Sequence, residues 1–213
     1  AGQAVSAVAP EASRAVTGGN PIQGVIVESR QVMEQVRERG GQGAVTSAEM
    51  LATAAIEEGK FAQAFPSFGP ERRGAPVIAF ARIDGSQILD RTAIQAPDVV
   101  MVLDPTIMRI VKVAAGLKKG GWLVVNSGKS PAEVADLTGW KGSIAVVNGN
   151  AIALAEIGQA ITNMVMLGAL VKALGVVGAE TLERLMQKRF GPVIGARNLK
   201  AFRRAAGETA VAS

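Results

Sequence analysis

Three short segments of the chain are almost wholly apolar, and each is followed by a polar turn and then by helical patterning. They are residues 98–103 (DVVMVL), 122–125 (WLVV) and 144–147 (IAVV). A strand buried on both faces of a parallel sheet has such a continuous apolar run, because helices cover it on both sides. The repeated strand–helix order therefore predicts an α/β fold, a Rossmann-like doubly wound sheet that is mostly parallel.

The residues before the first of these runs are predicted to supply one helix and a β-hairpin insertion. A helical pattern begins at Gly43 and stops at Gly59. The pair Asp84-Gly85 lies between apolar runs at 77–83 and 87–89, which is typical of a hairpin turn. Further strands are expected at 61–65 and at two less regular segments, 22–27 and 31–36.

The last third of the chain is predicted to be helical. Gly175 and Gly191 stand where helices would end. Residues 1–21 are rich in Ala, Ser and Gly with little periodicity, so we expect a flexible or partner-dependent arm there. Residues 22–213 would then form a single Rossmann-like domain. Its expected C-terminal helices are 151–157, 164–174, 179–190 and 196–206.

The composition restricts the chemistry of the chain. Its 213 residues include no Cys, no His and no Tyr. Iron–sulfur clusters need thiolates, and zinc sites nearly always use Cys or His. We therefore expect no metal site and no catalytic residue, and we interpret the chain as one subunit of a larger enzyme. We also expect a cytoplasmic location without disulfides, and no membrane span, because no apolar run reaches about 18–20 residues.

The positive charge is concentrated near the C-terminus. The formal net charge is +5, and residues 180–213 contain seven Lys or Arg against three Glu. On a helix, Arg197, Lys200 and Arg204 share one face while Leu199 and Phe202 share another. This face is either an ordinary solvated surface or a docking surface for an acidic partner. Nucleic-acid binding is not expected, because no aromatic residues alternate with these charges.

A glycine-rich loop, Gly40-Gly41-Gln42-Gly43, immediately precedes the first helix. Exposed amides at a helix N-terminus favour phosphate or another anion, and glycines allow close approach of a ligand. The match to a dinucleotide fingerprint is partial, because Thr46 occupies the third glycine position. A bound phosphate and a tight structural turn both remain open.

Arg72 and Arg73 lie in a loop bracketed by Gly and Pro, GPERRGAP (69–76). Guanidinium groups on a restricted loop suit bidentate recognition of phosphate or carboxylate. Surface salt bridges would give the same composition. The interpretation of this pair therefore stays open between an anion site and an ordinary surface.

Two other polar motifs have structural explanations. Gly128-Lys129-Ser130 lacks the first glycine of a P-loop, since position 123 is Leu. Ser130, Pro131 and Glu133 instead form the pattern of a helix capping box. Asn163 precedes an apolar helical segment, where it is either the helix N-cap or a ligand-binding residue.

Four segments of the chain, taken in order, closely resemble the gamma subunit of 2-oxoacid:ferredoxin oxidoreductases, of which the pyruvate enzyme is the best-known member. The resemblance extends over about residues 40–202. The four segments are GGQGAVTSAEMLA (40–52), QAFPSFGPERRGAPVIAFARI (63–83), PDVVMVLD (97–104) and NMVMLGAL (163–170).

The resemblance implies a complex that oxidatively decarboxylates a 2-oxoacid on thiamine diphosphate and passes electrons through [4Fe-4S] clusters to ferredoxin. It implies alpha, beta and delta-type partner subunits that hold the thiamine diphosphate and the clusters. In that family the gamma component is associated with coenzyme A. The residues expected to contact coenzyme A or a substrate anion are Gly40, Gly41, Gln42, Gly43, Thr46, Arg72, Arg73 and Asn163.

The sequence departs from the family pattern before the glycine loop. Family members approach this loop through a His-Gly-Arg-like segment, whereas this chain has Arg37-Glu38-Arg39, and its first 32 residues match no family segment. Some relatives oxidise 2-oxoacids without coenzyme A. A stand-alone nucleotide-binding module is the alternative function, since it needs only the glycine loop and a crevice in the sheet.

Overall fold

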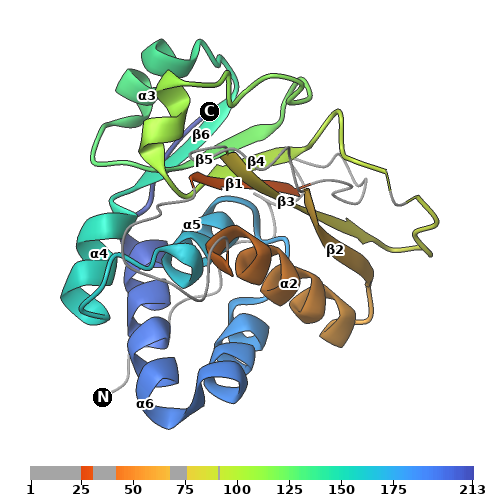
Figure 1. Cartoon of the computed structure of the whole chain (residues 1–213), viewed down its shortest axis with the longest axis vertical. Helices are drawn as coiled ribbons and strands as arrows, with labels where there is room; N and C mark the ends of the chain where they lie inside the picture. Colours follow the sequence, from red (N-terminus) through yellow and green to blue (C-terminus); the bar gives the residue numbers. More distant parts are fainter. Residues whose placement is uncertain (1–24, 31–41, 68–75, 91) are drawn as a thin grey trace.

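The computed structural model describes residues 25–30, 42–67, 76–90 and 92–213 (Figure 1). The expected arm at 1–21, the segment 31–36, the loop residues Gly40 and Gly41, and the pair Arg72 and Arg73 lie outside these ranges. Within them, no helix combines the length and the apolar character needed to cross a membrane. The elements in chain order are β1 (Val25–Arg30), α2 (Gln42–Glu57), β2 (Phe61–Ser67), β3 (Pro76–Asp84), β4 (Val99–Val102), the 3-10 helix η1 (Pro105–Arg109), β5 (Trp122–Asn126), α3 (Pro131–Thr138), β6 (Ser143–Val147), α4 (Gly149–Glu156), α5 (Asn163–Leu174), α6 (Ala179–Glu208) and β7 (Ala210–Ala212).

The strands form a seven-stranded sheet in the order β2-β3-β1-β4-β5-β6-β7. Strands β1, β4, β5 and β6 are paired in parallel, which confirms the α/β class and the three strands expected from the apolar runs. The sheet is nevertheless mixed. Strand β7 pairs antiparallel with β6 at one edge, and β3 pairs antiparallel with β1 and with β2 at the other.

The apolar runs are buried on both faces of this sheet. Successive residues of β4, β5 and β6 alternate between two hydrophobic clusters, because side chains of a strand point alternately to opposite faces. Helices α2, α4, α5 and α6 cover one face, while η1 and α3 cover the other (Figure 1). Continuous hydrophobicity therefore follows from a three-layer architecture.

Small side chains bring α2 close to the sheet. Ala79 and Ala81 of β3 are fully buried on the face that α2 covers, and Ala44, Ala54 and Ala55 of α2 are fully buried against it. Alanine adds little bulk between the two backbones and is the strongest helix former. This composition explains how a core poor in aromatic residues fills its volume.

The hairpin insertion exists, but the predicted pairing of its strands is wrong. The hairpin joins β2 to β3 with Phe61 opposite Asp84, whereas residues 87–89 are not in a strand. The side chain of Asp84 instead accepts hydrogen bonds from the backbone N–H and the hydroxyl of Ser86, each at 2.9 Å. This local turn redirects the chain away from β3, so the Asp-Gly signal marks the end of β3 and not the centre of a hairpin.

The C-terminal third is helical as expected, and the two last predicted helices meet in a sharp bend within α6. Gly191 interrupts the helix with φ 71° and ψ −178°, a conformation open to glycine. Gly175 ends α5 in the left-handed conformation, with its N–H donating to the carbonyl of Val171. Both glycines therefore end a helical segment, as the sequence predicts.

The predicted capping box at the start of α3 is confirmed. The hydroxyl of Ser130 accepts from the backbone N–H of Glu133, and the carboxylate of Glu133 accepts from the N–H of Ser130. These hydrogen bonds, the backbone one first, hold the pKa of Glu133 below its ordinary value. The motif GKS at 128–130 therefore begins a helix, and its lysine pairs with Glu133 at 3.5 Å.

Glu156 connects α4 to α6 and gives the fold a pH dependence. Its carboxylate lies 2.8 Å from Lys200 Nζ and 3.0 Å from Arg204 Nη1. The hydrogen bond from Lys200, followed by that from Arg204, lowers the pKa of Glu156 below its ordinary 4.5. A carboxylate with a lowered pKa stabilises the fold above its unfolded pKa, and this contribution is lost as the pH falls through the folded pKa.

We expect Glu156→Gln to reduce the loss of thermal stability between about pH 5 and pH 3. The measurement is the unfolding midpoint across that range for both proteins. Glu180→Gln is the matched control, because Glu180 is exposed and makes no ion pair with the residues that the structure describes. Parallel pH curves for the Glu156→Gln variant and the unsubstituted chain would contradict the assignment.

Candidate functional site

The carboxyl ends of the parallel strands lie together at one end of the sheet, beside the N-terminus of α2. We call this end of the sheet the carboxyl edge. Strand β1 leads to α2 and the hairpin on one side, whereas β4, β5 and β6 extend the sheet on the other. The direction in which the chain adds strands to the sheet therefore reverses between β1 and β4. In open α/β sheets, ligands bind in the crevice at this point, outside the carboxyl ends of the strands.

Contacts bring the start of α2 against the end of β4 and the start of α5. A Cβ added at Gly43 would lie 3.8 Å from Leu103 Cδ1, just beyond β4. The buried hydroxyl of Ser47 lies 3.0 Å from the carbonyl of Gly43 and 3.4 Å from the carbonyl of Asn163. Two predicted site residues, Gly43 and Asn163, are thus on elements joined at this edge, while Thr46 lies half-buried in the first turn of α2.

Asn126, at the end of β5, connects the neighbouring loops. Its side chain is 1% exposed; the amide nitrogen donates to the carbonyl of Leu103 at 2.7 Å and to Asn150 Oδ1 at 3.1 Å. Its oxygen accepts from the backbone N–H of Asn150 at 3.3 Å. One buried amide thereby fixes the end of β4 and the first turn of α4 relative to β5.

The start of α4 completes the edge. Asn148 caps the helix by accepting from the backbone N–H of Ala151 at 3.1 Å. A Cβ at Gly149 would lie 3.1 Å from Asn126 Oδ1 and 3.2 Å from Met166 Sδ, so this position is tightly packed between β5 and α5. The edge therefore carries backbone amides and the neutral side-chain amides of Asn148 and Asn150, together with the carboxylate of Asp104, which caps η1 directly after β4.

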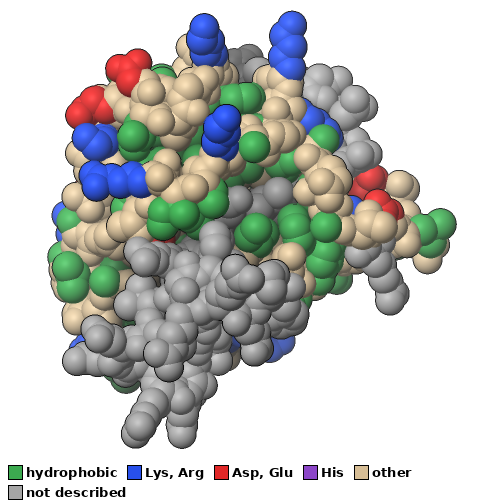
Figure 2. Space-filling view, turned by 45° about the horizontal axis from the view of Figure 1, so that its top comes forward, with side chains coloured by type: hydrophobic (Ala, Val, Ile, Leu, Met, Phe, Trp, Pro, Cys, Tyr) green, Lys and Arg blue, Asp and Glu red, His purple; other side chains and the backbone are tan. Residues whose placement is uncertain are grey.

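This arrangement is suited to binding and less to catalysis. Neutral amides and helix N-termini attract anions and orient polar ligands, but they do not exchange protons near neutral pH. Among the described residues, no group of three Asp or Glu side chains is arranged to hold a metal ion. Figure 2, which turns the α3 side forward, shows Lys and Arg side chains scattered among neutral ones and not gathered into one patch.

The flanks of the arginine loop lie at the same edge. Strand β3 runs antiparallel to β1, and its first residue, Pro76, is opposite Arg30, the last residue of β1. In the hairpin, Ser67 is opposite Ile78. Ser67 and Pro76 are the described residues on either side of 68–75. Both residues that border 68–75 therefore lie toward the carboxyl end of β1.

The other residues predicted for the site lie either outside the described ranges or at the start of a helix. Gly40, Gly41, Arg72 and Arg73 lie outside the described residues, and Gln42 is the first residue of α2. Asn163 is not the N-cap of α5: Thr162 occupies that position, and Asn163 is the first helical residue, with its own oxygen accepting from the N–H of Met164 at 2.9 Å.

Sequence reasoning missed Asn126, Asn148 and Asn150. Each follows the end of an apolar strand, in WLVVN and in IAVVNGN. Polar residues directly after consecutive parallel strands gather at one edge, because those strands end side by side. This signal is present in the sequence and could have identified the network.

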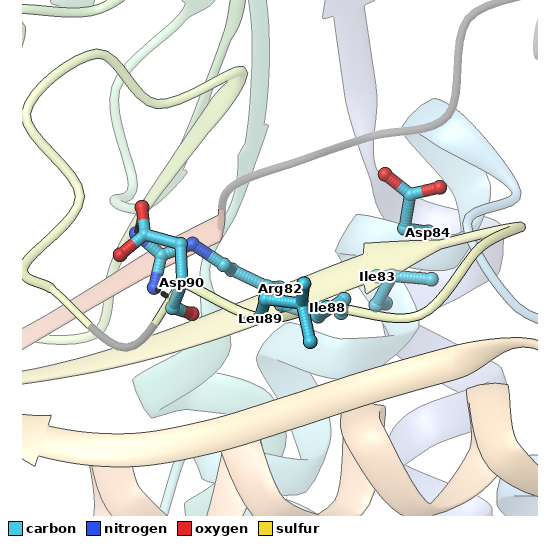
Figure 3. A pocket seen from close by; sticks show the side chains of 6 residues that line it. All are labelled: Arg82, Ile83, Asp84, Ile88, Leu89 and Asp90. Atoms are coloured by element: carbon cyan, nitrogen blue, oxygen red, sulfur yellow. Dashed lines mark hydrogen bonds and ion pairs between the residues drawn. The ribbon is translucent and has the colours of Figure 1, made fainter.

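A shallow pocket lies at the opposite end of β3, away from this edge. It has a volume of about 210 Å³ and lies between the end of β3 and residues 88–90 (Figure 3). Arg82 crosses it to pair with Asp90 at 3.2 Å, and its guanidinium carbon is 5.5 Å from the ring centre of Phe65. Hydrogen bonds from Thr92, the backbone one first, lower the pKa of Asp90, and Arg82 adds to this. The charged groups that line the pocket are already paired with each other, so we assign no ligand to it.

Comparison with known proteins gives consistent matches over most of the chain. Residues 36–208 match the family model described as pyruvate ferredoxin/flavodoxin oxidoreductase. The chain is 49% identical over 174 residues to the pyruvate/ketoisovalerate oxidoreductases common subunit gamma of Thermococcus kodakarensis, a match that covers 81% of this chain and 94% of that one.

Solved structures show the same similarity in three dimensions. The crystal structure of pyruvate oxidoreductase subunit PORC from Thermotoga maritima superposes with a TM-score of 0.77 at 38% identity, over 91% of this chain and 99% of that one. The keto/oxoacid ferredoxin oxidoreductase gamma subunit from Geobacter sulfurreducens superposes with a TM-score of 0.65 at 27% identity, over 87% and 97%.

Proposed function

Since the chain belongs to the pyruvate ferredoxin/flavodoxin oxidoreductase family as a gamma-type subunit, we propose that it supplies the anion-binding edge of a complex that oxidatively decarboxylates a 2-oxoacid. The ligand of this edge is coenzyme A or a substrate anion. The partner subunits, of alpha, beta and delta type, hold the thiamine diphosphate and the [4Fe-4S] clusters and pass electrons to ferredoxin. The complex works in the cytoplasm.

The observation that carries this proposal is the convergence of three features at one edge of the sheet. The N-terminus of α2 lies beside Leu103, the amide network of Asn126 fixes the neighbouring loops, and Ser67 and Pro76, which border residues 68–75, lie toward the same edge. A helix N-terminus and two guanidinium groups together suit the phosphates of coenzyme A.

The chain's own part is binding and orientation. When bound, coenzyme A supplies the thiol that accepts the acyl group. The amides at the start of α2, from Gln42 and Gly43, would hold one phosphate group, and Arg72 and Arg73 would hold another. With no Cys or His in the sequence, the chain has no thiolate or imidazole with which to bind a cluster or move a proton, so the redox steps fall to its partners.

The test is the Arg72→Ala and Arg73→Ala variants in the assembled complex. Each lost charge-assisted contact costs about 1–3 kcal/mol, so we expect the KM for coenzyme A to rise about 5-fold to 150-fold per variant. The KM for the 2-oxoacid and the stability of the complex should not change. Steady-state kinetics with coenzyme A varied at saturating 2-oxoacid measure the effect.

Arg184→Ala is the matched control. Arg184 is an exposed arginine of α6 whose Nη2 lies 2.6 Å from Glu57, at the far end of α2 from its N-terminus. Its removal should leave the KM for coenzyme A unchanged. An unchanged KM in both Arg72→Ala and Arg73→Ala would remove the arginine pair from the proposal.

A further inference from the structure

The bend of α6 lies at the end of the molecule away from the sheet (Figure 1), and it carries exposed apolar side chains. We call residues 190–194 (FGPVI) the α6 bend. Within it, Val193 is 68% and Ile194 56% exposed. The cost of leaving two adjacent branched side chains in water is about 1.5–3 kcal/mol each relative to burial. These two adjacent side chains form a small contiguous apolar surface, which burial against another protein would remove from water.

The bend is held rigidly. Gly191 turns the backbone, and a Cβ at Gly195 would lie 3.1 Å from Gln187 Cα, so the two limbs of α6 are in close contact beside the bend. Further along, Arg203 donates two hydrogen bonds to Glu183, at 2.7 and 2.6 Å, and joins the limbs again. A rigid apolar tip loses little conformational entropy when it binds.

Ion pairs also fasten each limb to the rest of the domain. On the first limb, Arg184 pairs with Glu57 and Arg189 pairs with Glu49, both on α2. On the second, Lys200 and Arg204 both pair with Glu156 of α4. Each of the two limbs that carry the bend is therefore attached to another helix of the domain by ion pairs.

The charges of α6 divide into two classes. Five of its seven cations are paired with an acidic side chain, as described above. The other two, Lys188 and Arg197, are exposed and have no ion pair among the residues that the structure describes. Lys188 lies five residues before Val193, and Arg197 lies three residues after Ile194. The unpaired cations therefore flank the apolar tip.

We propose that the α6 bend docks into an apolar socket bordered by carboxylates on a partner subunit of the same complex. The proposal rests on the proposed function, since it requires the multisubunit assembly. Charge complementarity selects this occupant: two copies of a chain with net charge +5 repel one another, whereas an acidic rim pairs with Lys188 and Arg197. The bend supplies the buried centre of the contact and the two cations its polar rim.

The test measures how tightly the assembled complex retains this chain. Complexes carrying Val193→Ser with Ile194→Ser, or Lys188→Glu with Arg197→Glu, are diluted and their dissociation is followed by mass photometry. We expect each double variant to raise the dissociation constant of the chain at least 10-fold. In the charge-reversed variant the salt dependence of this contact should change sign, because added salt then screens the repulsion between the introduced carboxylates and the acidic rim.

Two matched controls address general surface effects. Leu89→Ser with Ile110→Ser removes two apolar side chains that are 82% and 60% exposed elsewhere, and Lys119→Glu with Lys141→Glu reverses two exposed lysines. Both controls should dissociate like the unsubstituted complex. Unfolding midpoints of the isolated variants within 2 °C of the original would exclude misfolding as the cause.

Three results would overturn the proposal. The first is a dissociation constant within twofold of the original for both bend variants. The second is sedimentation of the isolated chain as a dimer that the bend variants make monomeric, because the occupant would then be a second copy. The third concerns residues 1–21. If deleting them raises the dissociation constant as much as the bend variants do, and the bend variants add nothing to the deletion, the bend contacts residues 1–21 and not a partner subunit. The KM for coenzyme A, measured while the complex is intact, should stay unchanged, which separates this test from that of the anion site.

Discussion

Gly168→Ala is expected to lower the free energy of unfolding by about 2–3 kcal/mol. Gly168 is in the middle of α5, where the helix crosses α6. A Cβ added there would overlap the carbonyl oxygen of Phe202 and lie 3.1 Å from its carbonyl carbon. The obstacle is backbone and not a flexible side chain, so α5 and α6 must move apart. This cost exceeds the roughly 1 kcal/mol that alanine gains in helix propensity.

Gly207→Ala is the matched control for this substitution. Gly207 also lies in a helix, near the end of α6, but a Cβ there would have no neighbour within 4 Å. We expect a gain of about 0.5–1 kcal/mol from propensity alone. Urea unfolding of both variants measures the difference. If the two substitutions shift stability in the same direction by similar amounts, close helix contact at Gly168 is not what requires glycine.

Asn126→Asp is expected to cost about 3 kcal/mol or more at pH 7. The substitution keeps the shape of the side chain but removes both N–H donors, so the carbonyl of Leu103 and the oxygen of Asn150 each face a buried carboxylate. An unsatisfied buried acceptor alone costs about 1–3 kcal/mol, and the buried charge adds to this. The loops after β4 and β5 should separate, and coenzyme A binding should weaken with them.

This loss should depend on pH with a definite sign. Burial raises the pKa of the introduced carboxyl in the folded state above its unfolded value of about 3.9, so the destabilisation grows as the pH rises through that value. Below it, the protonated carboxyl donates one hydrogen bond, and much of the stability returns. Unfolding curves at about pH 4 and pH 7 test this expectation.

Asn148→Asp is the control, because it makes the same chemical change at an exposed helix cap. Within the described part of the chain, the Asn148 side chain makes a single hydrogen bond, which it accepts from the N–H of Ala151, and aspartate is an equally good N-cap. Its stability should change by less than about 0.5 kcal/mol. Equal losses at both positions would show that the network of Asn126 is not what holds the edge together.

The sequence predicts the elements of this fold better than it predicts their pairing. The strands at 98–103, 122–125 and 144–147 are found in place, because burial on both faces leaves a local signature. The pairing of 77–83 with 87–89 is wrong, although Asp84-Gly85 favours it locally. Strand β3 pairs with β2 on one side and with β1 on the other, and two long strand partners outweigh one short one.

The arrangement of residues at the carboxyl edge can be predicted from the sequence only in part, for the same reason. The glycine loop and Asn163 were selected from local motifs, and the structure brings Gly43 and Asn163 to elements that meet at the carboxyl edge. The network of Asn126 was missed, since its partners are 23 and 24 residues away in the chain. Of the two less regular segments expected to be strands, 22–27 overlaps β1, which is found at Val25–Arg30, and 31–36 lies outside the described residues.

By itself, the sequence determined the α/β class, the buried central strands, the glycines that end α5 and bend α6, and a side-chain inventory without thiol or imidazole. These properties depend on single residues or on neighbours within one turn or strand, so they can be read locally. Only the tertiary structure decided which strands β3 joins, which loops Asn126 connects and which cations of α6 have an ion pair with another described residue. Those features depend on contacts between distant segments, and their energies exist only once the chain has folded.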